Sequence, residues 1–492
     1  MLNWLYTQAL ARPDGPAVYY DGACVTYREL HTQVAHAVQA LQALGVGAGS
    51  GVAVLMGNRL TTIVAIHALM RLGATLVMLN TRLTVDELAH QMQVAVCQVL
   101  LYDEANLSNA MALSLRQTDL KPIVAEQFGG APNRNIAKSD AGRDIDLTAP
   151  AVIMFTSGST GKPKGVVLTW ENFWHSAMTS AYRLGVLPKD RWLCVLPLYH
   201  VGGLSIVLRS CLYGTAIDLH PKFDAYIIHQ ALLTQPVTLI SLVPTMLSRL
   251  LDSGATGEIY SHVRLVLLGG AAATPELMAR ATAAAIPVAT TYGLTEATSQ
   301  VATALPVDVQ RKPGSVGKAL VFTELRVVDE TRCDMPTAEI GEVIVRGPTI
   351  MRGYLNDMTA TAHAIQDGWL HTGDLGYLDS AGDLYLVQRR SDLIVSGGEN
   401  VYPAEVEAIL RKHPAVQDVA VVGVSSAEWG QQVAALIVPT PNATLTAEAL
   451  SVFCRQSLAG YKVPRLFRFR AALPQTASGK VDRVEVTRML GG

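Results

Sequence analysis

The chain has few charged and few aromatic side chains for its length. Of its 492 residues, 16% are Asp, Glu, Lys or Arg, and 6% are Phe, Trp or Tyr. Because 39 Lys and Arg stand against 41 Asp and Glu, the formal net charge is −2. No basic excess is available to bind nucleic-acid phosphates. Half of the residues are hydrophobic, which excludes a disordered chain. The 40 glycines are typical of an α/β enzyme, and the length predicts more than one domain.

The sequence also lacks metal, disulfide and membrane signals. None of its 6 cysteines stands in a C-x-x-C motif, so we expect reduced, unpaired thiols. The first residues have neither the basic region nor the apolar core of a signal peptide. The longest apolar run, residues 192–208, is interrupted by Pro197, His200, Gly202 and Gly203 and therefore predicts a strand, a loop and a helix start. A cytoplasmic protein without membrane insertion is expected.

Strand and helix signals alternate through most of the chain. Thr26 and Glu29 form a capping-box pattern ahead of an amphipathic helix. The apolar pattern predicts helices at 61–72 and 86–96, and strands at 52–56, 74–79, 98–102, 151–155, 192–196, 238–243, 265–268 and 288–291. Such alternation predicts parallel sheets covered by helices. Residues 107–150 are polar and weakly periodic, so we expect irregular connections there.

The last third of the chain changes character twice. Short β-rich runs at 325–328 and 342–345 predict a small barrel-like subdomain at about 314–388. After Arg389, helices at 405–411 and 446–458 and strands at 419–424 and 433–438 predict an α+β unit. The expected organisation is a large N-terminal α/β domain, residues 1–389, and a small mobile C-terminal domain, residues 390–492.

A segment rich in glycine and hydroxyl groups follows the strand at 151–155. Glycines let a backbone approach phosphates closely, hydroxyls donate to phosphate oxygens, and lysines neutralise their charge. The segment is neither a Walker A motif, G-x-x-x-x-G-K-S/T, nor a G-x-S-x-G nucleophile elbow, so a P-loop ATPase is excluded. The predicted phosphate-binding residues are Thr156, Ser157, Gly158, Ser159, Thr160, Gly161, Lys162 and Lys164.

Together with six further motifs in the same order, this loop resembles the acyl-adenylate-forming superfamily. That superfamily includes acyl- and aryl-CoA ligases, firefly-type luciferases and peptide-synthetase adenylation domains. The resemblance covers essentially the whole chain. The six motifs are L-Y-H-V-G-G at 198–203, L-G-G-A at 268–271, Y-G-L-T-E at 292–296, W-L-H-T-G-D at 369–374, S-G-G-E-N at 396–400 and P-Q-T-A-S-G-K at 474–480.

The resemblance implies two half-reactions. A small-molecule carboxylate attacks the α-phosphorus of ATP, giving acyl-AMP and pyrophosphate, and the CoA thiolate then displaces AMP. The implied co-reactants are ATP, Mg²⁺ and CoA. Implied catalytic residues are Lys480, which bridges carboxylate and α-phosphate, Thr295 on the α-phosphate, Glu296 on Mg²⁺, and His200. The other implied nucleotide-binding residues are Gly269, Gly270, Ala271, Tyr292, Gly293, Asp374 on the ribose, and Arg389.

Each of these side chains also has a structural interpretation. Taken alone, Asp374 could cap a turn, Glu296 could cap a helix, Lys480 could be a solvated lysine, and His200 a core histidine. The motif context favours the functional interpretation in each case.

The resemblance further implies that the small domain rotates between half-reactions. One orientation presents Lys480, and the other presents a hairpin that lines a pantetheine tunnel, with Ser396, Gly397, Gly398 and Glu399 as CoA-binding residues. The hinge is expected near 390–391, although Gln388 and Ser391 depart from the family pattern. In the basic segment 461–470, Arg468 and Arg470 are expected to face outward, and Lys462 or Arg465 to lie near the CoA phosphates.

The acyl pocket segment 196–205, followed by Arg209 and residues 219–224, resembles 2-succinylbenzoate–CoA ligases of menaquinone and phylloquinone synthesis, as does the segment 292–301. The expected acyl-binding residues are His200, Gly203, Leu204, Ser205, Ser299 and Gln300. Ser299 and Gln300 could face the second carboxylate of the substrate, for which no dedicated cation is identified. Alternatives are another aryl- or short-chain acyl-CoA ligase, or a stand-alone adenylation enzyme that loads a carrier protein. A homo-oligomer is left open.

Overall fold

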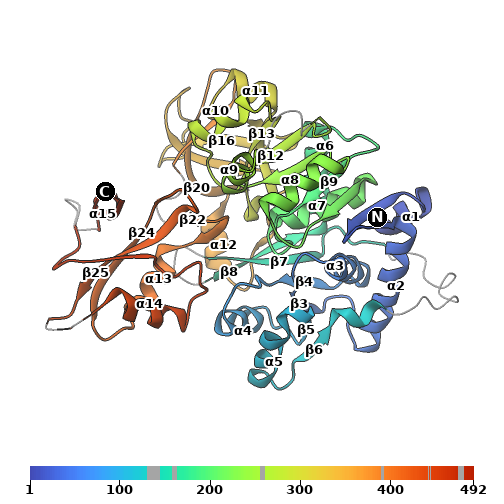
Figure 1. Ribbon diagram of the computed structural model, residues 1–492, viewed down its shortest axis with the longest axis horizontal. Helices are drawn as coiled ribbons and strands as arrows, with labels where there is room; N and C mark the ends of the chain where they lie inside the picture. The colour runs from blue at the N-terminus through green and yellow to red at the C-terminus, as the bar shows by residue number, and fades with distance from the viewer. Residues whose placement is uncertain are drawn as a thin grey trace.

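The structure of the chain is a computed structural model. It describes residues 1–129, 144–157, 163–254, 261–388, 393–441, 443, 445–474 and 481–491. Its strands form a 7-stranded, a 14-stranded and a 5-stranded sheet. We call residues 1–388 the main unit and residues 393–491 the C-terminal unit. Figure 1 shows the C-terminal unit, in orange and red, beside the two sheets of the main unit.

The 7-stranded sheet contains the first βα units. Its order is β18-β8-β7-β4-β3-β5-β6, and the strands from β7 to β6 run parallel. The strands are β3 (Gly51–Leu55), β4 (Thr75–Met78), β5 (Val99–Tyr102), β6 (Lys121–Val124), β7 (Pro150–Ser157), β8 (Pro163–Thr169) and β18 (Gly353–Tyr354). The helices of this region are α2 (Tyr27–Ala43), α3 (Leu60–Leu72), α4 (Val85–Val94) and α5 (Leu107–Arg116). The expected capping box of Thr26 and Glu29 is present at the start of α2, and a second one, of Thr84 and Glu87, starts α4.

The 14-stranded sheet begins with a largely parallel half. This half consists of β1 (Pro16–Tyr20), β2 (Ala23–Thr26), β9 (Arg191–Cys194), β10 (Ala216–Leu219), β11 (Leu239–Leu242), β12 (Leu265–Leu268) and β13 (Val288–Leu294). Its helices are α1 (Trp4–Ala11), α6 (Trp170–Leu184), α7 (Val201–Tyr213), α8 (Ala225–Thr234), α9 (Pro244–Asp252) and α10 (Pro275–Ala283). The run at 192–208 forms β9, a loop and the start of α7, as predicted.

The other half of this sheet is antiparallel and contains the β-rich segment. Its strands are β14 (Ser299–Ala304), β15 (Ser315–Ala319), β16 (Glu324–Val328), β17 (Gly341–Arg346), β19 (Ile365–Gln366), β20 (Trp369–Leu378) and β21 (Leu384–Gln388), with the helices α11 (Pro306–Arg311) and α12 (Met358–Ala364). Pairing of β13 with β14 joins these strands to the parallel half. One continuous sheet therefore carries both the 288–294 segment and the 369–378 segment.

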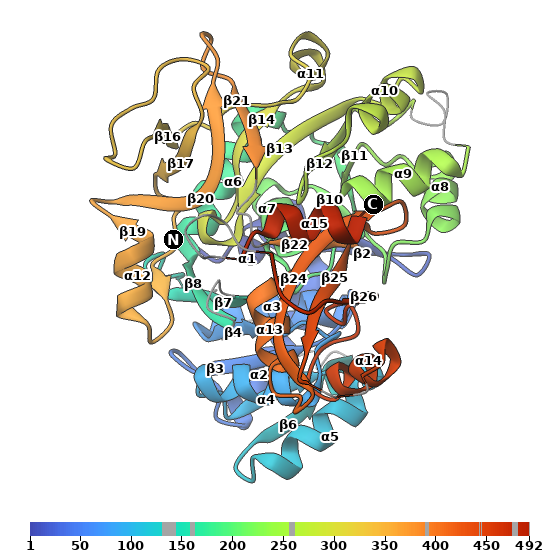
Figure 2. The same cartoon turned by 90° about the vertical axis from the view of Figure 1, so that its left-hand side faces the viewer.

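The C-terminal unit is built on a 5-stranded sheet of its own. It contains β22 (Ile394–Ser396), β23 (Glu399–Val401), β24 (Val416–Ser426), β25 (Gly430–Pro439) and β26 (Leu466–Phe469), with α13 (Pro403–Leu410), α14 (Ala447–Arg455) and α15 (Arg483–Gly491). The hairpin of β22 and β23 points toward the main unit. In Figure 2 this unit lies in front of the two main-unit sheets.

The expectation for residues 107–150 is wrong in part. The described residues of this stretch include α5 and β6, which pairs parallel to β5 at the edge of the 7-stranded sheet. The short polar strand, with exposed Lys121 and Pro122, gives no periodic signal because it is an edge strand. Within the described residues, no helix is long and apolar enough to cross a membrane.

Candidate active site

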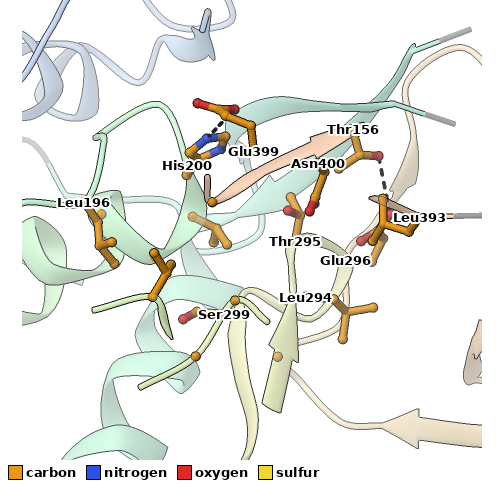
Figure 3. A pocket seen from close by; sticks show the side chains of 18 of the residues that line it. Thr156, Leu196, His200, Leu294, Thr295, Glu296, Ser299, Leu393, Glu399 and Asn400 are labelled. Carbon is orange, nitrogen blue, oxygen red and sulfur yellow. Dashed lines mark hydrogen bonds and ion pairs between the residues drawn. The ribbon is translucent and has the colours of Figure 1, made fainter. Parts of the chain in front are cut away.

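A cleft of about 830 Å³ lies where the two sheets of the main unit and the C-terminal hairpin meet. Its walls come from the loops after β3, β4, β9, β11 and β12, from the Y-G-L-T-E segment, from β20, and from the hairpin. Figure 3 shows Thr295, Glu296 and Ser299 on one side of this cleft, with His200 and Glu399 on another. Residues separated by about half the chain therefore share one cavity.

One part of the cleft wall is formed by Asp374, which is hydrogen-bonded to Tyr292. Asp374 lies on β20 and is only 6% exposed, and its Oδ2 accepts a 2.6 Å hydrogen bond from the Tyr292 hydroxyl on β13. The backbone of Gly269 and Gly270 lines the same cavity. Such a carboxylate can accept hydrogen bonds from ribose hydroxyls. The aromatic ring and the glycine turn beside it can contact a flat nucleotide base.

A second wall carries oxygen ligands and a lysine. The Thr156 hydroxyl lies 3.5 Å from Glu296 Oε1, which also accepts a 3.1 Å hydrogen bond from the Tyr354 hydroxyl. Lys164 Nζ lies 5.1 Å from the centre of the Tyr354 ring, so its positive charge faces the same wall. This combination of hydroxyl, carboxylate and ammonium groups is suited to phosphates.

These residues also fit Mg²⁺. No cluster of three or more His, Cys, Asp or Glu side chains that could hold a metal occurs among the residues that the structure describes. Mg²⁺ is commonly held by one or two carboxylates together with substrate phosphates rather than by an all-protein cage. Glu296, close to Thr156 on the cleft wall, could supply such a single hard carboxylate ligand.

The hairpin brings a buried carboxylate to the main unit. Glu399 is 4% exposed, and its oxygens lie 3.2 Å from His200 Nε2, 3.2 Å from Arg82 Nη1 and 3.0 Å from Asn80 Nδ2. Burial raises the pKa of Glu399, but His200 and Arg82 outweigh burial and lower the pKa to about 2. The carboxylate therefore remains ionised at neutral pH and binds the C-terminal unit to the main unit.

Two glycines form the tip of the hairpin. Gly397 has φ +60° and Gly398 has φ +87°, conformations that favour glycine. A Cβ atom at Gly397 would come within 2.8 Å of the Trp429 ring of the same unit, whereas one at Gly398 would point at Val243 of the main unit, 3.6 Å away. The absence of a side chain at Gly398 therefore leaves space between the two units.

A buried arginine of the acyl-side segment is the residue to which the sequence analysis assigned no role. Arg209 of α7 is 3% exposed and lines the cleft. Its Nη1 donates to Ser180 Oγ and to Gln300 Oε1, both at 3.0 Å, while Nε has no hydrogen-bond partner among the described residues. Its guanidinium lies 5.4 Å from the Trp192 ring, and burial lowers its pKa. The described part of the chain places no carboxylate in an ion pair with it.

The sequence feature that could have identified this arginine was its position. It interrupts an apolar helix, and arginine is almost never fully buried without an anionic partner. A buried cation without a carboxylate is costly unless a ligand supplies the anion.

The structure places the other predicted residues as follows. The cleft is lined by Thr156, Lys164, His200, Gly203, Gly269, Gly270, Gly293, Thr295, Glu296, Ser299, Gln300, Asp374, Gly397, Gly398 and Glu399. The residues that do not line it are Ala271, Leu204, Ser205, Ser396 and Tyr292, although Tyr292 bonds to Asp374. Leu204 packs into the main core because it faces away from the cleft on α7. The side chain of Ser157 and the residues Gly158, Ser159, Thr160, Gly161, Lys162, Arg389 and Lys480 lie outside the described part of the chain.

The interpretation of Lys462 as a CoA-phosphate ligand is wrong. Lys462 is 4% exposed and is held by two carboxylates, so it is not open to a phosphate. Arg465 is exposed, and its guanidinium lies 4.4 Å from the Trp429 ring. Arg468 and Arg470 are exposed, as expected.

Comparisons with known proteins agree with this geometry. Residues 5–355 match the family model of the AMP-binding enzyme, and residues 405–480 match that of the AMP-binding enzyme C-terminal domain. A 2-succinylbenzoate–CoA ligase from Bacillus cereus is 42% identical over 490 residues, covering 100% of this chain and 98% of that protein.

Two solved structures of one relative differ in their fit. The o-succinylbenzoate CoA synthetase of Bacillus subtilis, as a double mutant with the product analogue OSB-NCoA, is 36% identical, with 100% of this chain and 99% of that chain covered and a TM-score of 0.91. The same enzyme with ATP and magnesium ion is also 36% identical, with 99% of each chain covered, but its TM-score is 0.73. Because identity and coverage are nearly equal, these scores show that the whole chain superposes better on the product-analogue complex than on the complex with ATP and magnesium ion.

The sequence match therefore spans both sheets of the main unit and extends through the C-terminal unit. Where the motifs meet, the structure has a cleft. Its walls include the Asp374 carboxylate, the side chains of Thr156, Lys164 and Glu296, and the hairpin of the C-terminal unit. The chain belongs to the AMP-binding, acyl-adenylate-forming enzyme family.

Proposed function

We propose that the chain is an AMP-forming acid–thiol ligase that converts 2-succinylbenzoate, ATP and CoA into 2-succinylbenzoyl-CoA, AMP and pyrophosphate. The observation that carries the choice of substrate is the buried Arg209 in the wall of the cleft. A substrate with two carboxylates can leave one ionised beside Arg209 while the other reacts. The reaction belongs to menaquinone or phylloquinone biosynthesis, and the unpaired thiols fit a reducing cytoplasm.

The first half-reaction needs an anion to approach a polyanion. Lys164 and the phosphate loop would hold the β- and γ-phosphates, Asp374 the ribose, and Thr295 the α-phosphate. Mg²⁺, held by Glu296 and the phosphates, would neutralise charge on the transferring group. Lys480 would bridge the reacting carboxylate and the α-phosphate. Positive groups placed in advance where charge develops are the main source of rate acceleration in such sites.

The second half-reaction needs a path for the thiol. The hairpin tip, with no side chain at Gly398, leaves space opposite Val243 through which a pantetheine arm would reach the acyl carbon. The exposed guanidinium of Arg465 would lie near the CoA nucleotide. His200, held by Glu399, would border the acyl group on the cleft side.

We also propose the domain boundary at the junction of the two units, with residues 1–389 as the N-terminal domain and 390–492 as the mobile C-terminal domain. The separate 5-stranded sheet of the C-terminal unit supports this division.

Size-exclusion chromatography with light scattering would distinguish a monomer from a homo-oligomer.

The test is pyrophosphate release with ATP and Mg²⁺ across a carboxylate panel, with and without CoA. The panel contains 2-succinylbenzoate, benzoate, 4-coumarate, malonate, octanoate and amino acids. We expect release with 2-succinylbenzoate, and a CoA thioester when CoA is added. Release with a monocarboxylate alone would keep the adenylation chemistry and reject the role of Arg209. Release without thioester formation would favour a carrier-protein acceptor.

A further inference from the structure

Lys462 is buried between two glutamates that belong to different units. Its Nζ donates to Glu87 Oε1 at 2.6 Å and to Glu405 Oε1 at 2.7 Å, and all three side chains are at most 10% exposed. Burial lowers the pKa of Lys462, but the two glutamates outweigh burial and raise it. Lys462 is therefore charged in this arrangement.

Only one of these two ion pairs crosses between the units. Glu405 lies in the first turn of α13 and Lys462 precedes β26, so both belong to the C-terminal unit and move together. Glu87 lies in the first turn of α4 in the main unit. Rotation of the C-terminal unit would keep the Lys462–Glu405 pair and break the Lys462–Glu87 pair.

Glu87 is fixed before Lys462 reaches it. Its Oε2 accepts hydrogen bonds from the Thr84 backbone N–H and hydroxyl, both at 2.8 Å, and completes the capping box of α4. The other oxygen, Oε1, is the one that Lys462 binds. The helix cap thus orients one carboxylate oxygen toward the docking site at no further entropic cost.

The same short segment of the main unit supplies the neighbouring contacts. Asn80 and Arg82 bind Glu399 of the hairpin, and the Arg82 guanidinium lies 4.8 Å from the Tyr461 ring. Ala459, 1% exposed, packs into the apolar cluster of the 7-stranded sheet. Residues 80–87 therefore form a docking face for residues 459–462 and the hairpin.

We infer that Lys462 and Glu87 are positioning residues for the thioester-forming half-reaction alone. They form a buried ionic contact that holds the C-terminal unit in the arrangement that presents Gly398 to the cleft, and neither of them lines that cleft. The inference rests on the proposed ligase function. A buried ion pair is suited to this role because it imposes one geometry, and because loss of one partner leaves a buried charge unpaired.

The test measures the two half-reactions separately in Glu87→Gln. Glutamine can still complete the capping box, so α4 keeps its N-terminal cap while the charge that Lys462 needs is lost. We expect single-turnover thioester formation from supplied acyl-AMP and CoA to fall roughly 10- to 100-fold. Acyl-AMP formation from ATP should stay within about twofold of wild type.

Two matched controls separate docking from folding. Thr84→Ala removes the cap hydroxyl but keeps the carboxylate for Lys462 and the backbone N–H that orients it, so we expect a lower unfolding midpoint and an unchanged ratio of the two half-reaction rates. Lys412→Met removes an exposed lysine of the C-terminal unit and should change neither rate. Lys462→Met should reproduce the Glu87→Gln ratio, and the double variant should be no slower than Lys462→Met, because both remove the same contact.

An equal loss of both half-reactions in Glu87→Gln, or a normal thioester rate, would overturn the inference. Failure of the proposed function is a different result, because wild-type protein would then give no acyl-AMP or no thioester with any acid of the panel. The ratio of the two half-reaction rates in each variant is compared with that of wild type.

Discussion

Two buried carboxylates of the cleft, Asp374 and Glu399, are held in different ways. Asp374 is bonded to Tyr292, and both belong to the same 14-stranded sheet. Glu399 is bonded to Asn80, Arg82 and His200, all of which belong to the other unit. If the C-terminal unit rotates as proposed, the contact of Asp374 would persist, whereas the contacts of Glu399 would be lost. Contacts within a unit can serve both half-reactions, and contacts between units can serve one.

The largest expected effect comes from Lys480→Ala, which removes the predicted catalytic lysine of the C-terminal domain. If Lys480 acts in adenylation only, acyl-AMP formation should fall by about 10³-fold or more, with thioester formation from supplied acyl-AMP largely intact. Rapid-quench assays of each half-reaction measure this. A parallel loss in both would identify Lys480 as structural.

Arg209→Leu should affect both half-reactions because Arg209 lies within the main unit. We expect kcat/KM for 2-succinylbenzoate to fall by about 10²- to 10³-fold, since the second carboxylate would be buried without a cation. Benzoate, which has no second carboxylate, should not lose activity. Steady-state kinetics with both acids, including Arg209→Lys as the charge-conserving variant, tests the role. Equal losses for both acids would contradict it.

Gly398→Leu should disturb the contacts between the two units. A side chain there would contact Val243, and the backbone φ of +87° is unfavourable for a residue other than glycine. We expect thioester formation to fall by about tenfold or more, with little change in acyl-AMP formation. Gly382→Leu, at an exposed turn with φ +80° and nothing within 4 Å, is the control for backbone strain alone. If both variants lose thioester formation equally, space at the hairpin is not the cause.

The smallest expected effect is on pH dependence. The pKa of Glu399 is about 2 in the docked state against 4.5 in solvent, so its contacts stabilise docking above pH 4.5 and are lost as the pH falls toward 2. The difference in unfolding midpoint between wild type and Glu399→Gln should therefore be a few degrees at pH 6 and should shrink by pH 3.5. Differential scanning fluorimetry across this range measures it. A constant difference would show that the charge of Glu399 does not matter.

Local patterns were predictable from the sequence. The capping box of Thr26 and Glu29 spans four positions, and the strand at 265–268 is a continuous apolar run, so neighbouring residues alone determine both. The motifs were predictable as well, because each is contiguous, and most of the described residues among them line one cleft.

Features that depend on distant partners were not predictable. Lys462 is sequence-adjacent to basic and aromatic residues, but its partner Glu87 lies 375 positions away, so burial between carboxylates leaves no local trace. The role of Arg209 depends on Gln300 and Ser180, which β14 and α6 bring to it. The strand β6 has only 4 residues and begins with exposed Lys121 and Pro122 at a sheet edge, so it is too short and too polar to show a strand pattern.

The hairpin that closes one side of the cleft also has a consequence for the mixed anhydride formed inside it. Acyl-AMP reacts with water as well as with thiols, and a closed site limits that side reaction by excluding water. With the C-terminal unit docked, Gly398 and Val243 border the space between the units. The width of that gap would then set how much activated acid is lost to hydrolysis before CoA arrives, so one missing side chain would govern the yield of thioester per ATP consumed.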